Sequence, residues 1–246
     1  MMKTSRSKTL SLAAGLALSV FGVSSQAFSG PGTVTLSGGK TELAMAPQFF
    51  NLFPSFGDNL DKYGEASKKG NLNRQNIRIT FPLSSATLNP DRPDQAIGFY
   101  DFQHEGGMLM DRPSNGLSAI INTPSVHASN TCFASAQCLE MGAVLIVNGT
   151  VLDEVPNFAQ STSLPSSFQI ERGNRVNLNN VQMFLTQRGA NLMNAFFGLQ
   201  PGGALYLQAG NQFGTLNISG RGANVICPPG RPYDNRYQQC LTPPPR

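Results

Sequence analysis

The segment GFYDFQHEGGMLM, residues 98–110, gathers the side chains of this sequence that are best suited to chemistry. It holds Tyr100, Asp101, His104 and Glu105 within six positions, in a chain with only two histidines. An imidazole or a phenolate can bind haem iron, and a histidine beside a carboxylate can act as a general acid or base. The same letters also fit a structural β-strand that runs into a glycine bulge.

Strand geometry separates the polar side chains of this segment. Successive residues of a strand point to opposite faces, so Tyr100, Phe102 and His104 share one face while Asp101 lies on the other. His104 is therefore grouped with two aromatic residues and away from the carboxylate, which argues against an acid–base pair. A core histidine bonded to the backbone and a histidine that contacts a ligand both stay open. The glycines at 106–107 predict a turn or bulge.

The motifs that usually mark an enzyme are missing from the sequence. There is no G-x-S-x-G elbow, no HExxH, no phosphate-binding loop, and no second histidine at ligand spacing from His104. His127, in TPSVHASNTC, is expected in a solvated loop. We therefore expect neither catalytic residues nor a metal site, and no enzymatic activity.

The N-terminus has the order of features of a secretory signal peptide. Basic residues precede an apolar run at 10–23 that is too short to span a bilayer, and residues 25–27 have the small-x-small pattern of a cleavage site. We expect residues 1–27 to be removed and the protein to be exported, to the periplasm, the cell surface or the medium. No later apolar segment approaches membrane length, so we expect no transmembrane segment in the mature chain.

Export also explains most of the positive charge. The first 27 residues hold three of the 18 basic side chains and none of the 14 acidic ones, so the mature chain is close to neutral. A nucleic-acid-binding protein needs a concentrated basic footprint, which this sequence lacks. Nucleic acid is therefore not an expected partner.

The four cysteines form two close pairs, Cys132 with Cys138 and Cys227 with Cys240. In an exported protein, disulfides are the expected state, and local pairing closes two short loops. A zinc site is disfavoured, because neither pair has C-x-x-C spacing and no histidine lies close to either in sequence.

Most of the remaining chain predicts β-strands separated by Gly, Pro and Asn clusters, a pattern typical of a sandwich or a barrel. The expected strands are 33–37, 41–45, 76–82, 95–103, 116–121, 142–152, 166–171, 175–186, 204–208 and 213–219.

Two segments, 43–57 and 183–197, predict a strand that turns into a short helix and match each other at a shift of 140 residues. Pro47 suits a first helical position and Thr186 suits an N-cap. The match is either an internal repeat or a chance likeness of two apolar segments.

Three segments resemble a known family. ITFPLSSATLNP is similar to FPITGGTLDP-type strands, GFYDFQHEGGMLM to a G-x-I-x-H-S-G-G-L-x-F segment, and residues 181–219 to a closing segment with the pattern LTLTxxAAxxLNxxFG. These motifs belong to secreted bacterial proteins of the HtaA haem-binding domain family and its single-domain relatives. The resemblance covers most of residues 33–219 and implies an antiparallel β-sandwich with short helices, so we expect one domain over residues 28–220. The proline-rich segment between Cys227 and Cys240 predicts a disulfide tail at 221–246.

The sequence departs from this family where haem is bound. In haem-transporting members a tyrosine in the early strand–helix region binds the iron, but TELAMAPQFFNLFPSFG has none. His104 matches the histidine of the H-S-G-G motif. We therefore expect a non-catalytic secreted or envelope binding module that holds haem or another apolar small molecule near Tyr100 and His104. The alternative is a structural or adhesive surface protein that contacts an envelope component and has no small-molecule ligand.

The mature protein is expected to begin near Phe28 and to contain two disulfides and no free thiol. Intact mass spectrometry of the exported protein checks both points, because reduction should add one hydrogen for every cysteine. An uncleaved N-terminus or a smaller mass change would contradict the expectation of export.

Overall fold

The computed structural model describes residues 32–53, 59–89, 100–113, 116–135, 137–165, 169–171, 174–227, 229–234 and 239–241. The expected signal peptide and cleavage site lie outside the described residues.

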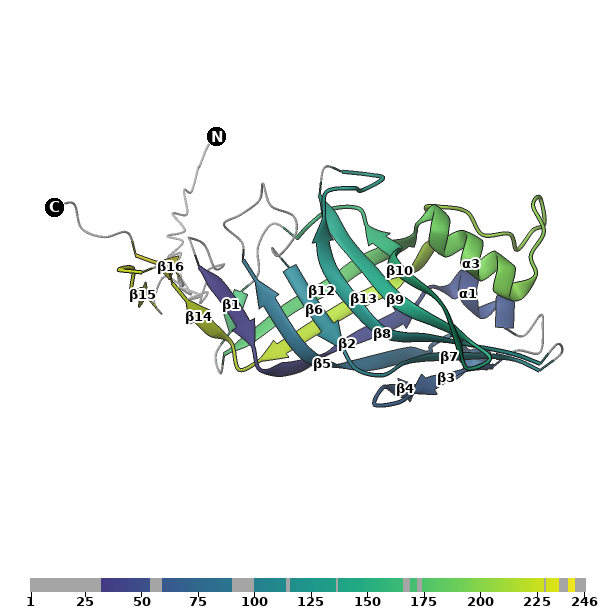
Figure 1. Ribbon diagram of the computed structural model, residues 1–246, viewed down its shortest axis with the longest axis horizontal. Coiled ribbons are helices and arrows are strands. Elements are labelled where there is room, and N and C mark those ends of the chain that lie inside the picture. The colour runs from purple at the N-terminus through teal and green to yellow at the C-terminus, as the bar shows by residue number, and fades with distance from the viewer. Residues whose placement is uncertain are drawn as a thin grey trace, which may run out of the picture.

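The described chain is mainly β, with a few short helices (Figure 1). The helices are α1 (Pro47–Phe50), the 3-10 turn η1 (Leu72–Arg74) and α3 (Gln187–Phe197). The strands are β1 (Thr33–Leu36), β2 (Gly38–Met45), β3 (Asn59–Tyr63), β4 (Ser67–Lys69), β5 (Arg78–Leu88), β6 (Tyr100–His104), β7 (Gly107–Arg112), β8 (Leu117–Ser129), β9 (Cys138–Val147), β10 (Thr150–Ser161), β11 (Gln169–Glu171), β12 (Arg175–Leu185), β13 (Gln212–Arg221), β14 (Asn224–Ile226), β15 (Tyr233–Asp234) and β16 (Gln239–Cys240).

The sheet closes on itself, so the expected β-sandwich is wrong and the fold is an antiparallel barrel. The ring runs β5–β2–β13–β12–β10–β9–β8–β6 and returns to β5. The closing strand is β6, which pairs with β5 on one side and with β8 on the other. Alternation of inward and outward residues is the same in a sandwich and in a barrel, so the sequence pattern did not distinguish them.

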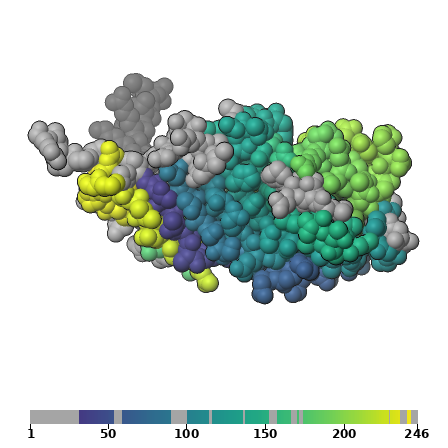
Figure 2. Space-filling view, viewed as in Figure 1, coloured from purple at the N-terminus to yellow at the C-terminus, as the bar shows by residue number. Residues whose placement is uncertain are grey.

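The other strands extend the barrel at its ends. β1 and β14 pair with each other and continue the sheet from β5. At the opposite end, β7 and β3 continue it from β8. The long strand β8 pairs with β6 through residues 125–127 and with β7 through residues 117–122, and between these two parts Thr123 has a φ of 41°. Figure 2 shows the C-terminal residues at one end of the molecule and the α3 region at the other.

Several elements differ from the sequence prediction. The expected strand 142–152 is the end of β9 and the start of β10, joined by a tight turn at Asn148 and Gly149 with φ of 48° and 79°. An Asn-Gly pair favours this hairpin turn because both positions need positive φ. Residues 204–205 form a turn and residues 206–208 have no regular structure, so the expected strand is not formed. His127 lies within β8 rather than in a loop.

Both strand-to-helix transitions are confirmed over the described residues, and residues 54–57 of the first segment lie outside them. α1 follows β2 and α3 follows β12, with N-cap residues Ala46 and Thr186 at equivalent positions of the 140-residue shift. β13 lies between β2 and β12, and the two helices lie side by side at one end of the barrel (Figure 1). Phe53, just after α1, meets Phe197 of α3 edge to face with ring centroids 5.3 Å apart.

The two local disulfides are also confirmed. Cys132–Cys138 closes the loop between β8 and β9, and Cys227–Cys240 ties the chain after β14 to β16. β14 lies beyond residue 220 but pairs with β1. The expected domain boundary at 220 stays a prediction. In the described part of the chain, no helix combines the length and apolar character needed to cross a membrane.

Helix α3 is held against β10 by its first turn. The Thr186 side chain accepts a hydrogen bond from the Gly189 amide and donates to the Asn157 carbonyl, and the Thr186 amide donates to the Phe158 carbonyl at 3.2 Å. Gly189 is so close to β10 that a Cβ there would lie 2.0 Å from the Phe158 oxygen. The glycine is therefore required by the close approach of helix and strand.

We predict that Gly189→Ala destabilises the protein. In an unconstrained helix this change stabilises by roughly 0.5–1 kcal/mol, whereas the clash here should cost roughly 1–3 kcal/mol. Urea denaturation measures the difference, with Asn191→Ala on the exposed face of α3 as the control that should be neutral or stabilising. A stabilised Gly189→Ala variant would show that α3 does not dock in this way.

Candidate functional site

The structure places Tyr100 and His104 inside the barrel. Both side chains point inward with Phe102, as the alternation predicts, while Asp101 and Gln103 point outward. His104 is 4% exposed and Tyr100 is fully buried. The Tyr100 hydroxyl donates to the Pro165 carbonyl at 3.1 Å, and burial raises the pKa of its phenol above the ordinary value. Tyr100 is therefore held as a neutral core residue.

His104 connects three strands from the centre of the barrel. Its Nδ1 lies 2.6 Å from the Pro124 carbonyl oxygen of β8, and its Nε2 lies 2.6 Å from the Thr41 hydroxyl of β2. A carbonyl oxygen only accepts, so Nδ1 carries the proton and Nε2 of the neutral ring accepts from Thr41. Both ring nitrogens are thus occupied by protein partners.

Burial also keeps the His104 ring neutral. Desolvation lowers the pKa of the imidazole from 6.5 to about 4, against smaller opposite effects of the Pro124 carbonyl and the Asp101 charge. A buried, doubly hydrogen-bonded, neutral imidazole acts as a structural bridge. Ligand binding by Tyr100 and His104 stays a prediction, and the geometry gives both residues partners within the protein instead.

The second histidine belongs to a polar row on the outward face of the sheet, in which Glu140 and Gln160 are buried. Asp101, His127, Glu140 and Gln160 are successive cross-strand partners on β6, β8, β9 and β10. His127 Nε2 lies 3.5 Å from the Glu140 carboxylate, and Gln160 donates to it at 2.6 Å. Burial alone would raise the pKa of Glu140, but hydrogen bonds from His127 and Gln160 outweigh it and lower the pKa below its usual range.

This row supports the first disulfide loop. Gln160 donates to the Thr131 carbonyl at 3.0 Å and accepts from the Phe133 amide at 3.2 Å. The row therefore holds this loop in place.

Among the described residues, no group of three or more His, Cys, Asp or Glu side chains is placed to hold a metal ion.

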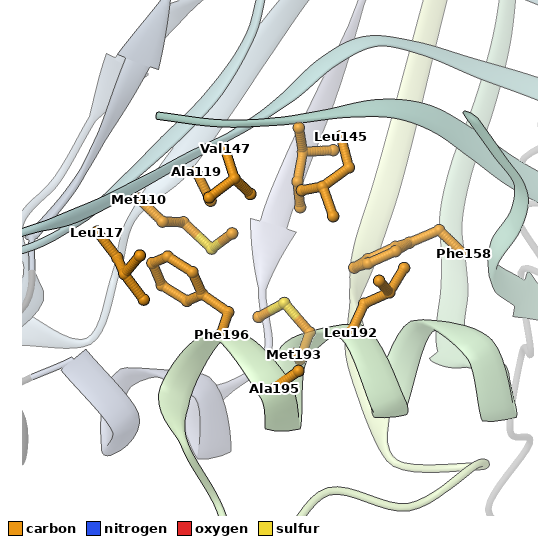
Figure 3. A pocket seen from close by; sticks show the side chains of 11 residues that line it. Met110, Leu117, Ala119, Leu145, Val147, Phe158, Leu192, Met193, Ala195 and Phe196 are labelled. Atoms are coloured by element: carbon orange, nitrogen blue, oxygen red, sulfur yellow. The ribbon is translucent and has the colours of Figure 1, made fainter. Parts of the chain in front are cut away.

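An apolar cavity of about 200 Å³ lies between α3 and the strands that extend and close the barrel (Figure 3). All of its lining side chains are apolar. They are Met110 of β7, Leu117, Ala119 and Ile121 of β8, Leu145 and Val147 of β9, Phe158 of β10, and Leu192, Met193, Ala195 and Phe196 of α3.

Strand register explains why the space exists. Met110, Ala119 and Val147 are directly opposite one another on β7, β8 and β9. The small alanine in the middle of this row leaves room between two larger neighbours. Figure 3 shows these side chains facing Phe196 and Met193 of α3 across the gap.

Helix α3 cannot easily collapse into the gap, because it is fixed at both ends. Thr186 holds the first turn to β10. Arg112 of β7 donates to the Phe196 carbonyl at 2.8 Å near the last turn. Leu192 and Leu117 are partly exposed and Ala195 is exposed, so the cavity opens to solvent at the edge of the helix.

The chemistry of this cavity is limited to apolar binding. No histidine, tyrosine or cysteine is among the residues that line it, so the usual His, Tyr or thiolate haem ligands are missing. Pockets for drug-sized ligands have volumes of roughly 300–1,000 Å³, and an engineered cavity of about 150 Å³ in another protein binds benzene. The space fits one ring or a short chain and is too small to enclose a haem.

Sequence reasoning missed the cavity. The apolar residues at 192–196 were visible in the sequence as one side of a short helix. The row formed by Met110, Ala119 and Val147 depends on the pairing register of three strands, which the sequence does not reveal.

Comparison with known proteins supports the fold, and it does not identify a ligand or an activity. No protein-family model matches the chain, and no curated protein does. A solved structure is similar: the C-terminal domain of HtaA from Corynebacterium glutamicum, with a TM-score of 0.51 and 11% identity. The match covers 78% of this chain and 99% of that domain. At this identity the similarity is one of fold.

We predict that His104 makes stability depend on pH. The unfolded imidazole titrates near 6.5 and the folded one near 4, so its contribution is complete above pH 6.5 and falls as the pH drops towards 4. The loss should reach about 3 kcal/mol.

Urea denaturation of the protein and of His104→Gln, between about pH 7 and pH 4.5, measures this contribution. The variant should be less stable at neutral pH, and its stability should fall less on acidification. Subtracting the two curves cancels Glu140 and His127, which both proteins share. If the free energy of unfolding fell equally with pH in the two proteins, the assignment of His104 as a buried neutral residue would be contradicted.

Proposed function

We propose that this chain is a non-catalytic binding module, exported from the cell, and that its ligand is a small apolar molecule held between α3 and strands β7 to β9. The observation that carries the proposal is the cavity beneath α3, lined entirely by apolar side chains. Well-packed protein interiors have few voids larger than a water molecule, so an open apolar space of this size is a candidate ligand site.

Three features favour binding over a packing defect. The cavity is kept open by hydrogen bonds at both ends of α3, so it does not depend on a ligand for its shape. It also opens beside partly exposed Leu117 and Leu192, which gives a small molecule a path to the interior. Met110 and Met193 add flexible side chains that can adapt to different occupants.

Haem is not the ligand proposed here. The cavity is too small, and the family's tyrosine has no counterpart in the matching segment of this sequence. The likeness to the HtaA domain supports the framework, a barrel capped by helices, rather than the identity of the ligand. The disulfides favour an oxidising compartment such as the cell envelope or the medium.

We predict that benzene and n-hexanol bind in the cavity. With methionine methyl groups labelled for NMR, the Met110 and Met193 signals should shift saturably, whereas Met45 and Met183 should not. Ala119→Phe, which fills the cavity from β8, and Leu192→Trp, which fills it from the helix side, should both abolish the shifts.

The matched control is Val144→Ile, which enlarges a side chain on the opposite face of β9. It should keep the wild-type response. Two variants are needed because either replacement could overpack the core, and only variants with a cooperative unfolding transition are compared. Absence of saturable shifts in the wild-type protein, or their survival in the folded filled variants, would refute the proposal and favour a structural or adhesive role.

A further inference from the structure

The surface far from α3 carries a second hollow of opposite character. A groove of about 400 Å³ lies across β2, β13 and β12 and is lined by Gly39, Lys40, Arg175, Ser219, Gly220 and Arg221. We call it the basic groove. It sits where β13 ends, next to β1 and β14, whereas β13 begins beside the helices (Figure 1). The basic groove is thus separate from the apolar cavity.

Strand register forces the cations of the basic groove together. Arg175 and Arg221 are directly opposite each other on β12 and β13, and Lys40 is opposite Ser219 on the other side of β13. Cross-strand partners share a face and have Cβ atoms about 5 Å apart, so like charges in these positions are destabilising. The Arg221 side chain extends over Gly38, where a Cβ would lie 3.5 Å from its Nε.

Two carboxylates, those of Glu42 and Glu171, are neighbours of this cluster of three cations in the strand register. Glu42 is two residues from Lys40 on the same face of β2, but its carboxylate is held by Arg78 at 2.8 Å. Among the residues whose side chains the structure describes, the salt bridges are Lys68–Asp61, Arg78–Glu42 and His127–Glu140, and none of them involves Lys40, Arg175 or Arg221. Glu171 is opposite Arg175 in the register of β11, on the side away from Arg221.

We propose that the basic groove binds a phosphate group that carries more than one negative charge. Arginine forks form paired hydrogen bonds to phosphate oxygens, and lysine adds a point charge. The Ser219 hydroxyl, on the same face between the cations, adds a further donor. Such a ligand relieves the repulsion between Arg175 and Arg221. The phosphate can come from a soluble compound or from the headgroup of an envelope lipid.

The first test titrates the mature protein with pyrophosphate at low salt by calorimetry, with thermal unfolding as a second readout. Pyrophosphate should bind saturably, raise the melting temperature and bind less well as salt increases. Each of Arg175→Gln and Arg221→Gln should weaken binding about tenfold, because charge-assisted hydrogen bonds are lost. Glu171→Gln should leave binding unchanged or strengthen it.

The matched control is the double variant Lys69→Gln/Arg74→Gln, which removes two exposed positive charges elsewhere. It should bind pyrophosphate as the wild-type protein does. The double variant Arg175→Gln/Arg221→Gln should lose binding and, without ligand, should be as stable as the wild type or more so. Absent binding, or equal binding in the two double variants, would overturn the proposal.

A second arm separates the sources of phosphate. Vesicles of phosphatidylglycerol, compared with vesicles of phosphatidylcholine, are pelleted with the wild-type protein and with the two double variants. Pelleting with phosphatidylglycerol alone that needs Arg175 and Arg221 would assign a lipid headgroup, and pyrophosphate binding without pelleting would assign a soluble phosphate. If the protein neither binds pyrophosphate nor pellets with phosphatidylglycerol vesicles, the basic groove is not a phosphate site.

Discussion

Closure of the sheet through β6 is the constraint on which the rest of this structure depends. β6 is only five residues long and must pair with both β5 and β8 to complete the ring. The buried His104 reinforces this closure from inside, since its ring joins β6 to Thr41 of β2 and Pro124 of β8. Replacing Thr41 by valine would leave the buried Nε2 of His104 without a hydrogen-bond partner, which costs about 1–3 kcal/mol.

Closure also determines where a ligand can sit. Inside the barrel, Tyr100, Phe102 and His104 have buried side chains, and none of them lines the apolar cavity. The space lies instead where the sheet passes beyond the ring into β7 and the helices cover the open end. There, α3 is fixed at its ends by Thr186 and Arg112, and the short side chain of Ala119 leaves a gap beneath it.

The sequence predicted local features of this fold well. The inward grouping of Tyr100, Phe102 and His104 follows from the two-residue period of a strand, and the disulfides follow from the close spacing of the cysteines. The two helix starts were visible because Pro47 and Thr186 have positional preferences that depend on a few neighbours.

Features that depend on distant pairing were not predictable in the same way. A sandwich and a barrel share one alternation pattern, so only the double pairing of β6 separates them. The hairpin turn at Asn148 and Gly149 did have a local signal, but apolar alternation continues through it and favoured one long strand. Both the apolar cavity and the basic groove arise from register across three strands, which a linear sequence does not encode visibly.

The most direct test of this account is a crystal structure of the mature protein exposed to xenon under pressure. Xenon occupies apolar cavities without needing polar contacts, so it reports space that is open in the folded protein. The account predicts xenon between α3 and β8, in contact with Ala119, Phe158 and Met193, within a closed barrel. A barrel whose α3 packs directly on Ala119, with no xenon between them, would contradict it.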